Sequence, residues 1–336
     1  DPMFVDTVNG NYHLLASSQL INAGHPDSLD SDGTVADIGT YPYLNSYSGP
    51  TWYISESGND TTATGTSTDP FRSIQAGINF SSDADSVTVA AGTYVENINF
   101  RGRNIKVVGA DQETTIIDGD SSGTVVTFSN GEDSTAVLSG FTIKDGLASY
   151  GSGMYLLGAN PTITNVTISG NTSNANGSGM YLLGANPTIT NVTISGNTSN
   201  ANGGGMYLRN GSDPTLTNVT ISGNTANIYG GGMSLDGASP TITNVIISGN
   251  TANIYGGGMN LYDSDPTLTN VIISGNTATN EHGGGMNLYE SDPTLTNVTI
   301  SENTANSDGG GLYCQGNSNP VIVNSILWNN ASNEIT

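Results

Sequence analysis

A repeat of 26 or 27 residues constrains the fold of this chain more than any other feature of its sequence. A Gly-x-Gly-Met/Leu signature begins seven times, at intervals of 26, 26, 27, 26, 27 and 26 residues: at Gly151, Gly177, Gly203, Gly230, Gly256, Gly283 and Gly309. A fixed period of this length indicates a stack of repeated supersecondary units. The two added residues fall in turns, one before Pro214 and the other within 277–282, so the strands keep their register.

Within each repeat, apolar and polar residues alternate, as in Met154-Tyr-Leu156 and Ile163-Thr-Asn-Val166-Thr-Ile168. A period of two indicates short strands with one face inward. Such strands bury that face when successive repeats stack about 4.8 Å apart and pair their backbones. The sequence therefore predicts an all-β fold, a right-handed parallel β-helix with coils of 26–27 residues.

Stacking brings identical residues into columns along the axis. One internal column should contain Met154, Met180, Met206, Met233, Met259, Met286 and Leu312. Asparagines recur at a strand corner, as Asn165, Asn191, Asn218, Asn244, Asn270, Asn297 and Asn324, and again at the next turn, from Asn171 to Asn303. Because stacked amides can hydrogen-bond along a column, we interpret both files as structural ladders.

The chain before the regular coils contains one amphipathic stretch, Phe71 to Asn79, which predicts a short capping helix. An open β-helix end exposes unpaired strand edges, and a cap prevents uncontrolled pairing there. The strand-like runs at 87–90 and 105–109 predict first coils that are less regular than the later ones. Residues 48–120 are therefore expected to form the cap and first coils, and residues 121–336 the regular β-helix.

Three blocks carry a resemblance to a known family: Thr51 to Asp60, Asp69-Pro-Phe-Arg-Ser-Ile-Gln-Ala-Gly-Ile78 and Ala91-Gly-Thr-Tyr-Val-Glu-Asn97. With the coils, they resemble bacterial secreted and surface proteins of the pectin-lyase-like, right-handed β-helix type. The resemblance implies a location outside the cell or on its surface. Asp1-Pro-Met-Phe-Val-Asp6 and Ile21-Asn-Ala-Gly24 resemble the segment that closes the last coil in that family, so residues 1–47 look like the end of a preceding β-helix unit.

This order of parts predicts a head-to-tail contact of the chain with itself. Either the chain is one period of a tandem β-helix protein, or each subunit uses residues 1–47 to close the C-terminal open end of a neighbour. An arbitrary boundary of the sequence is the alternative explanation. A heterologous contact propagates into a filament unless it closes into a ring. The leading functional prediction is therefore a non-enzymatic, extracellular structural rod.

The charge of the chain excludes some partners and suggests others. Six Lys and Arg against 29 Asp and Glu give a formal net charge of −23, which disfavours nucleic acid and anionic membranes. No apolar run is long enough to insert into a membrane. Cations are the expected small partners, and structural Ca²⁺ is the one cofactor considered.

Two groups of acidic residues are candidate metal ligands. Asp265 and Asp292 occupy one position in adjacent coils, where like charges repel unless a cation or water screens them. The segment that contains Asp27, Asp30, Asp32 and Asp37 is oxygen-rich but lacks the last glutamate of an EF-hand loop. A simple Asp/Gly turn is the alternative for this segment.

Few residues suggest catalysis. Arg209 stands beside Asp236 in one outward column, which could serve a polysaccharide lyase or hydrolase, although a surface ion pair explains it better. His282 lies in an inserted turn without convergent partners in the sequence pattern. The sequence therefore predicts no catalytic residues and no enzyme, with a lyase or hydrolase as the second alternative.

Columns of tyrosine suggest a different activity. Tyr155, Tyr181 and Tyr207 are expected to face outward in one column, and Tyr262 and Tyr289 in another. Tyrosine ladders on sheets are usually cross-strand packing, but they can also stack on sugar rings. The first alternative to a structural rod is therefore a glycan-binding adhesion module.

Overall fold

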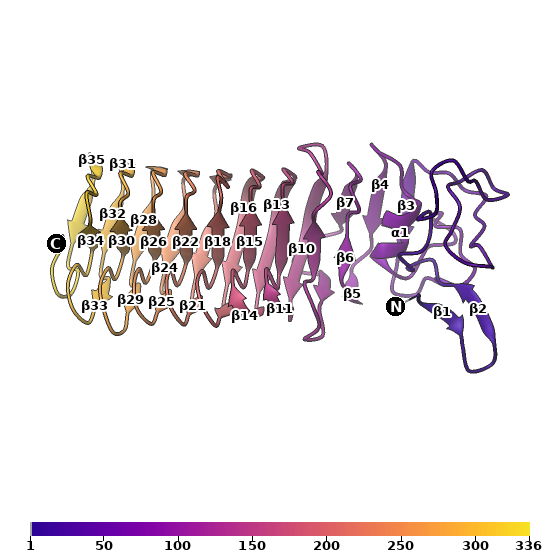
Figure 1. Ribbon diagram of the computed structural model, residues 1–336, viewed down its shortest axis with the longest axis horizontal. Helices are drawn as coiled ribbons and strands as arrows, with labels where there is room; N and C mark the ends of the chain where they lie inside the picture. Colours follow the sequence, from indigo (N-terminus) through magenta and orange to yellow (C-terminus); the bar gives the residue numbers. More distant parts are fainter. Residues whose placement is uncertain (1) are drawn as a thin grey trace.

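The computed structural model of the protein describes residues 2–336 and shows an all-β parallel solenoid of about 9 coils with about 26 residues per turn. The coils are stacked along one axis into a rod, with the N-terminal segment at one end and the last coil at the other (Figure 1). The predicted fold class and coil length are confirmed. No helix among residues 2–336 has the length and apolarity that would carry it across a membrane.

Each regular coil contributes a strand to one sheet that we call the methionine sheet, because Met stands first in most of its strands. Its members are β6 (Ile98–Asn99), β9 (Val126–Phe128), β12 (Met154–Leu157), β15 (Met180–Leu183), β18 (Met206–Arg209), β22 (Met233–Asp236), β26 (Met259–Tyr262), β30 (Met286–Tyr289) and β34 (Leu312–Gln315). All pair in parallel, and Met154 is paired with Met180, which is paired with Met206. The predicted column of methionines thus lies in register.

A second, bent sheet follows, in which the chain turns a corner. Its first side contains β3 (Thr51–Ile54), β4 (Ser86–Val89), β7 (Lys106–Gly109), β19 (Thr215–Thr217), β23 (Thr241–Thr243), β27 (Thr267–Thr269), β31 (Thr294–Thr296) and β35 (Val321–Val323). Its second side contains β5 (Gly92–Val95), β8 (Thr115–Asp118), β20 (Thr220–Ser222), β24 (Ile246–Ser248), β28 (Ile272–Ser274), β32 (Thr299–Ser301) and β36 (Ile326–Trp328). The long strands β10 (Val137–Lys144), β13 (Thr162–Ser169) and β16 (Thr188–Ser195) run through the corner and join the two sides.

A third, narrow sheet completes the coil. It contains β11 (Leu147–Tyr150), β14 (Thr172–Asn176), β17 (Thr198–Ser199), β21 (Thr225–Ala226), β25 (Thr251–Ala252), β29 (Thr277–Ala278) and β33 (Thr304–Ala305). Between this sheet and the methionine sheet stands the repeated glycine triplet. A Cβ added to Gly232, at the third position of the triplet, which is glycine in every one of these coils, would meet the carbonyl oxygen of Gly258 in the next coil. The coils approach too closely there for any side chain, which explains the glycines of the repeat.

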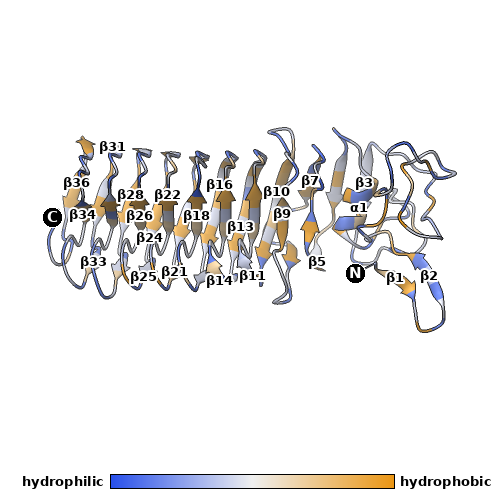
Figure 2. Cartoon of the chain, viewed as in Figure 1, coloured by the Kyte–Doolittle hydropathy of each residue, from blue (hydrophilic) through white to orange (hydrophobic). Residues whose placement is uncertain are grey.

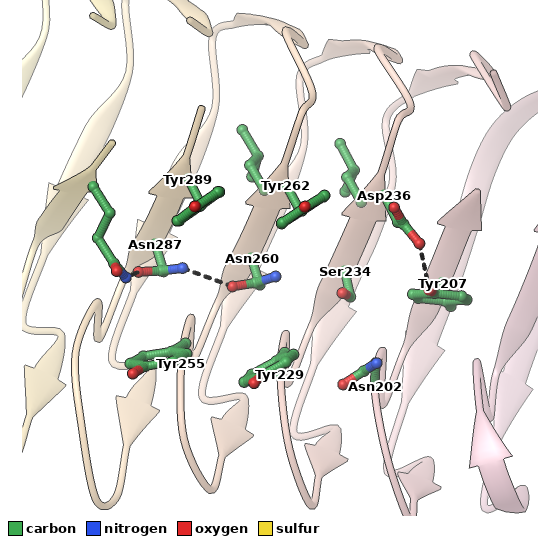
Figure 3. A pocket seen from close by; sticks show the side chains of 13 residues that line it. Asn202, Tyr207, Tyr229, Ser234, Asp236, Tyr255, Asn260, Tyr262, Asn287 and Tyr289 are labelled. Atoms are coloured by element: carbon green, nitrogen blue, oxygen red, sulfur yellow. Dashed lines mark hydrogen bonds between the residues drawn. The ribbon is translucent and has the colours of Figure 1, made fainter. Parts of the chain in front are cut away.

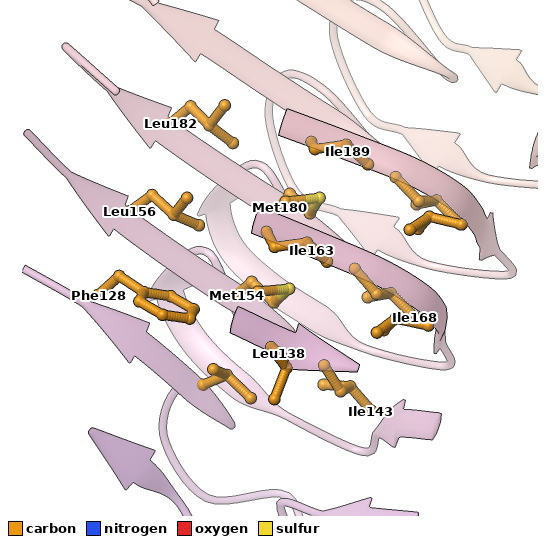
Figure 4. Close-up of a cluster of buried hydrophobic side chains, with 14 of the residues drawn as sticks. Phe128, Leu138, Ile143, Met154, Leu156, Ile163, Ile168, Met180, Leu182 and Ile189 are labelled. Atoms are coloured by element: carbon orange, nitrogen blue, oxygen red, sulfur yellow. The ribbon is translucent and has the colours of Figure 1, made fainter. Parts of the chain in front are cut away.

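The core is a narrow column of apolar side chains between the sheets (Figure 4). Met154, Leu156 and Ile163 are fully buried, as are their counterparts in the following coils through Met286 and Leu295. Because each coil supplies the same few residues, a chain of low overall hydrophobicity still builds a continuous core.

The two asparagine files differ in burial. Asn165 to Asn324 lie at the exposed corner of the bent sheet with positive φ, between 50° and 56°, a conformation that asparagine adopts more readily than most residues. Their amides bond along the file, as Asn218 Nδ2 does to Asn191 Oδ1 at 3.2 Å. The second file is fully buried. There Asn224 donates from its backbone N and from Nδ2 to Asn250 Oδ1, both at 3.0 Å.

The cap contains the one helix of residues 2–336, α1 (Ile74–Phe80), and all seven of its residues are buried. It begins three residues after the predicted start. The Glu96 carboxylate accepts hydrogen bonds from the backbone N–H groups of Ile74 (2.7 Å) and Gln75 (3.0 Å) at the start of the helix. Burial raises the pKa of Glu96 to about 7.

The N-terminal segment packs on the end of the rod, over the cap of its own chain (Figure 1). It contains an antiparallel hairpin of β1 (Phe4–Asp6) and β2 (Asn11–Leu14). Asn79 Nδ2 in α1 donates to the carbonyl oxygens of Ala16 (2.9 Å) and Ser18 (2.8 Å), and Tyr43 Oη donates to Ala63 O at 2.7 Å. The predicted contact of this segment with a neighbour's open end stays a prediction.

Candidate functional site

A groove of about 420 Å³ runs along the outer face of the methionine sheet over β22, β26 and β30. Three parallel rows of side chains form it, with Tyr262 and Tyr289 in one wall, Tyr229 and Tyr255 in the other, and small polar residues between them (Figure 3). The lining residues are Asn202, Tyr207, Tyr229, Ser234, Leu235, Asp236, Tyr255, Asn260, Leu261, Tyr262, Asn287, Tyr289 and Gln315.

The groove exists because one outward column changes residue type along the rod. In β12, β15 and β18 the residue after the methionine is tyrosine, and the rings fill the space above the sheet. In register with them, β22, β26 and β30 place Ser234, Asn260 and Asn287. These shorter side chains leave open the volume that the rings occupy in the earlier coils.

Stacked aromatic rings make both walls. The ring centroids of Tyr262 and Tyr289 lie 5.2 Å apart with an interplanar angle of 3°. In the opposite wall, Tyr229 and Tyr255 stack at 5.4 Å and 19°. This wall continues through His282, whose ring lies 5.9 Å from that of Tyr255.

The expectation that His282 has no partners is therefore wrong. Besides Tyr255, its ring stacks on Tyr313 at 4.1 Å, and its nitrogens approach the carboxylates of Glu281 (3.5 Å) and Asp308 (3.9 Å). The turns of adjacent coils stack as regularly as the strands do, so a residue that looks isolated along the sequence has neighbours one coil away.

Amides make the floor of the groove. Asn287 Nδ2 donates to Asn260 Oδ1 at 2.8 Å, and Gln315 Nε2 donates to Asn287 Oδ1 at 3.0 Å. Asn260 Nδ2 has no hydrogen-bond partner within residues 2–336 and faces the groove beside Ser234 (Figure 3). The floor thus holds a free amide donor and a serine hydroxyl between two aromatic walls, which suits a ligand with hydroxyl groups and apolar ring faces.

A three-residue polar cluster closes one end of the groove. Asp236 Oδ2 accepts a hydrogen bond from Tyr207 Oη at 3.0 Å and lies 3.1 Å from Arg209 Nε. Burial, together with the negative charge of Asp236, raises the pKa of the Tyr207 hydroxyl. Asp236 is the one carboxylate among the lining residues, and it is already paired.

The predicted tyrosine columns are in register, but the structure uses them in different ways. Tyr181 and Tyr207 stand on the outer face as expected, but neighbouring side chains cover them, and they are only 6% and 5% exposed. Tyr150 in β11 and the neighbouring Tyr155 pack against Tyr181, with ring centroids at 5.2 and 5.6 Å. Tyr207, Tyr262 and Tyr289 line the groove, whereas Tyr155 and Tyr181 lie outside it.

Tyr229 and Tyr255 were not among the predicted site residues. Both stand in an Ile-Tyr-Gly-Gly-Gly sequence that occurs in two successive coils, 26 residues apart. That repetition marks a column of its own. It could have been identified from the sequence by aligning the turns as well as the strands.

The acidic candidate ligands hold backbone N–H groups. Asp265 Oδ1 accepts from the backbone N of Asp292 at 2.6 Å, and Asp292 Oδ1 accepts from Asn319 in the same way. Such bonds compensate the like charges that stack in this turn.

In the N-terminal segment the aspartates build turns. Asp30 Oδ2 accepts from the backbone N of Asp37 at 2.9 Å, and Asp37 Oδ1 accepts from that of Asn22 at 2.8 Å. Asp32 accepts from Thr34 and Asn45, while Asp27 is exposed. Within residues 2–336, no three His, Cys, Asp or Glu side chains converge as a metal site would need. Structural calcium stays a prediction.

Comparisons with known proteins agree with the fold. A family model described as the right handed beta helix region matches residues 128–296, half of the chain. A second model, for a protein family of unknown function (DUF1565), matches residues 56–101, which include the cap. No curated protein matches the sequence significantly.

Two crystal structures were matched to the chain by comparison of structures. Pectate lyase Pel9A superposes with a TM-score of 0.58 at 16% identity, over 84% of this chain and 80% of that chain. A pectin methylesterase in complex with a hexasaccharide superposes with a TM-score of 0.38 at 11% identity, over 83% of this chain and 91% of that chain. At these identities the likeness to pectate lyase shows the fold alone.

Proposed function

The chain belongs to the right-handed β-helix family, and from that premise we propose that it is a non-enzymatic, extracellular rod that binds an uncharged polysaccharide in its lateral groove. One observation carries the proposal: two walls of stacked tyrosines face each other across a floor of amides and a hydroxyl. A groove of this kind suits an extended ligand that lies along the rod axis.

The chemistry of the lining matches that of a sugar chain. Apolar sugar faces can pack against the exposed sides of Tyr262 and Tyr289, which are 51% and 37% exposed. Hydroxyl groups can bond to the free Asn260 Nδ2 and to Ser234. Because coils repeat about every 4.8 Å, the groove offers similar contacts several times along its length. Such repetition suits a polymer better than a small molecule.

Charge favours an uncharged polymer over a polyuronate. The lining contains no Lys or Arg, and its one charged residue is Asp236. The chain as a whole has a formal net charge of −23. A polyanion would find no basic partner among the lining residues and would be repelled by the acidic chain as a whole, whereas hydroxyl groups meet amides and tyrosines.

The arrangement of acidic groups supports a binding role. Glycoside hydrolysis generally needs two carboxylates on either side of the scissile bond, and the lining includes Asp236 alone. Asp236 is engaged by Arg209 and Tyr207, and Tyr207 is buried. We therefore propose binding without turnover.

Isothermal titration calorimetry tests the proposal with the whole chain and soluble oligosaccharides of glucose, xylose, mannose and galacturonate. We expect binding of at least one uncharged series and at least tenfold weaker binding of oligogalacturonate. Tyr262→Ala and Tyr289→Ala should each weaken the affinity about tenfold, because each removes a stacking surface. Tyr155→Ala removes the same side chain outside the groove, so its affinity should equal that of the wild type. Failure of every uncharged series to bind would contradict the proposal.

A lyase is the second candidate, since pectate lyase Pel9A has a similar fold and Arg209 with Asp236 lies at one end of the groove. Lyase cleavage creates an unsaturated product that absorbs ultraviolet light. If the wild type produces this absorbance from polygalacturonate and Arg209→Ala does not, the non-enzymatic proposal is wrong. We expect no turnover by either protein.

A further inference from the structure

The last coil differs from the coils before it on its outer face. β35 and β36 place Val321, Val323, Ile326 and Trp328 in register with Thr294, Thr296, Thr299 and Ser301 of the preceding coil. Ile322 and Leu327, which alternate with these residues, pack against the core. Ile326 and Trp328 are 60% and 62% exposed. Figure 2 shows the orange of hydrophobic residues at the end of the rod around β36. The outward residues change from hydroxyl-bearing to large apolar ones in the sequence itself. The position of this coil at the end of the rod does not explain that change of residue type.

The N-terminal segment is apolar on two sides. Leu14, Ala16 and Ile21 on its inner side are buried at the end of the rod. Val8 and Leu29 on its outer side are 92% and 64% exposed, and Tyr12, Ile38, Tyr41 and Leu44 are exposed as well. Burying an exposed valine or leucine in a contact removes apolar surface from water and is favourable. A short segment that exposes this many large apolar side chains is a candidate interaction surface.

These two surfaces contain most of the exposed large apolar residues of the molecule. Of the 21 such residues in the described chain, seven belong to residues 2–47 and five to residues 320–336. The two blocks lie at opposite ends of the long axis (Figure 1). The two blocks therefore cannot contact each other within one copy of this chain.

We propose that the outer face of residues 2–47 of one copy binds the outer face of residues 320–336 of a second copy, so that copies join head to tail. The contact is heterologous and leaves one free surface at each end of a dimer, so it extends into a filament. It uses neither the groove nor its ligand, so a failure of the proposed carbohydrate binding would leave it untouched.

The two tryptophans report on this contact directly. Trp52 in the cap is 1% exposed, whereas Trp328 lies in the proposed interface. As protein concentration rises, the emission of Trp328 should shift to shorter wavelength and its quenching by acrylamide should fall at least twofold, with Trp52 as a constant background. Sedimentation velocity should show the mass growing in the same range. Salt should strengthen association, because both copies are strongly acidic.

A coil-matched variant tests the last coil without an arbitrary change. A triple variant, Val321→Thr with Ile326→Thr and Trp328→Ser, gives this coil three of the four outward residues of the preceding one. We expect association to weaken at least tenfold. The control is Ile246→Thr with Ile272→Thr. These exposed isoleucines stand in the same column as Ile326, in the middle of the rod, so the control should associate like the wild type.

Mixing variants tests the head-to-tail direction. A second variant carries Val8→Ser, Leu29→Ser and Leu44→Ser and keeps the last coil intact. Neither triple variant should associate alone, but their mixture should form one-to-one pairs that grow no further. The proposal is overturned if the wild type stays monomeric with Trp328 fully quenchable at every concentration. It is also overturned if the N-terminal variant dimerises as well as the wild type, because the contact would then join two last coils.

Discussion

The coils around β12, β15 and β18 and the coils around β22, β26 and β30 have the same interior and different outer faces. Both sets bury a methionine and a leucine from each strand, in register from coil to coil. Outside, the first set carries a tyrosine ladder and the second a groove. The interior columns determine how the coils stack, so outer residues can change from one coil to the next without disturbing the stack. A few substitutions on a uniform scaffold are sufficient to create a site.

The largest expected loss of stability comes from disrupting the buried asparagine file, which both sets of coils share. Asn250 is fully buried, accepts two hydrogen bonds from Asn224, and donates to Ile221 O at 2.9 Å and to Asn276 Oδ1 at 3.0 Å. Asn250→Ala leaves several buried groups unpaired, and we expect it to lower the free energy of unfolding by about 4 kcal/mol. Equilibrium unfolding in urea measures the loss.

Asn244→Ala is the control for this prediction, because it removes the same side chain from the exposed corner of the same coil. Alanine at positive φ costs about 1–2 kcal/mol, so this variant should be clearly more stable than Asn250→Ala. Equal losses would mean that the buried file contributes no more than the exposed one.

The next largest loss of stability is expected from removing a ring of the tyrosine ladder, and this loss distinguishes the ladder from the groove. Tyr181 is packed between Tyr155 and Tyr207. Tyr181→Ser introduces the residue that stands at 234 in the groove, and it should cost about 3 kcal/mol of unfolding free energy because a buried ring is lost. Calorimetric melting would show a lowered transition temperature. An unchanged melting temperature would indicate that the ladder rings add little to stability.

The reverse substitution introduces a tyrosine, as in the ladder, into the floor of the groove. Asn260→Tyr places a ring in the floor, and we expect it to weaken the binding of an uncharged oligosaccharide at least tenfold, which corresponds to about 1.4 kcal/mol. Titration calorimetry measures the affinity, and the melting temperature of the same variant controls for folding. Retained affinity in a stable variant would place the ligand elsewhere.

The smallest loss of stability is expected at the boundary between the two sets of coils, where β18 lies beside β22. Arg209 and Asp236 form a half-exposed ion pair, with side-chain exposures of 48% and 35%. Arg209→Ala should lower the free energy of unfolding by less than about 1 kcal/mol, and added salt should diminish the difference further. Urea unfolding at low and high salt checks this. A larger loss that persists at high salt would show that the pair is part of a buried network.

The site was predicted less completely than the fold. The pattern of Tyr262 and Tyr289 identified one wall of the groove. Tyr229 and Tyr255 were not predicted, because they lie outside the strands, where the alternation of apolar and polar residues carries no information. Alternation assigns Tyr181 and Tyr207 to the outer face of the sheet, but it does not tell whether residues on that face are exposed. In the structure, neighbouring rings cover that part of the face.

The sequence by itself determined the coil, its period and its interior columns, because stacking forces equivalent residues of successive repeats into register and requires the inner ones to be apolar, small or able to pair. Only the tertiary structure decided which outer positions are covered and which are open. That depends on how far apart the turns on either side of a sheet lie and on which side chains fill the space between them. Burial of the outer tyrosines and the opening of the groove both follow from contacts between different segments of the coil, and no local pattern of residues encodes those contacts.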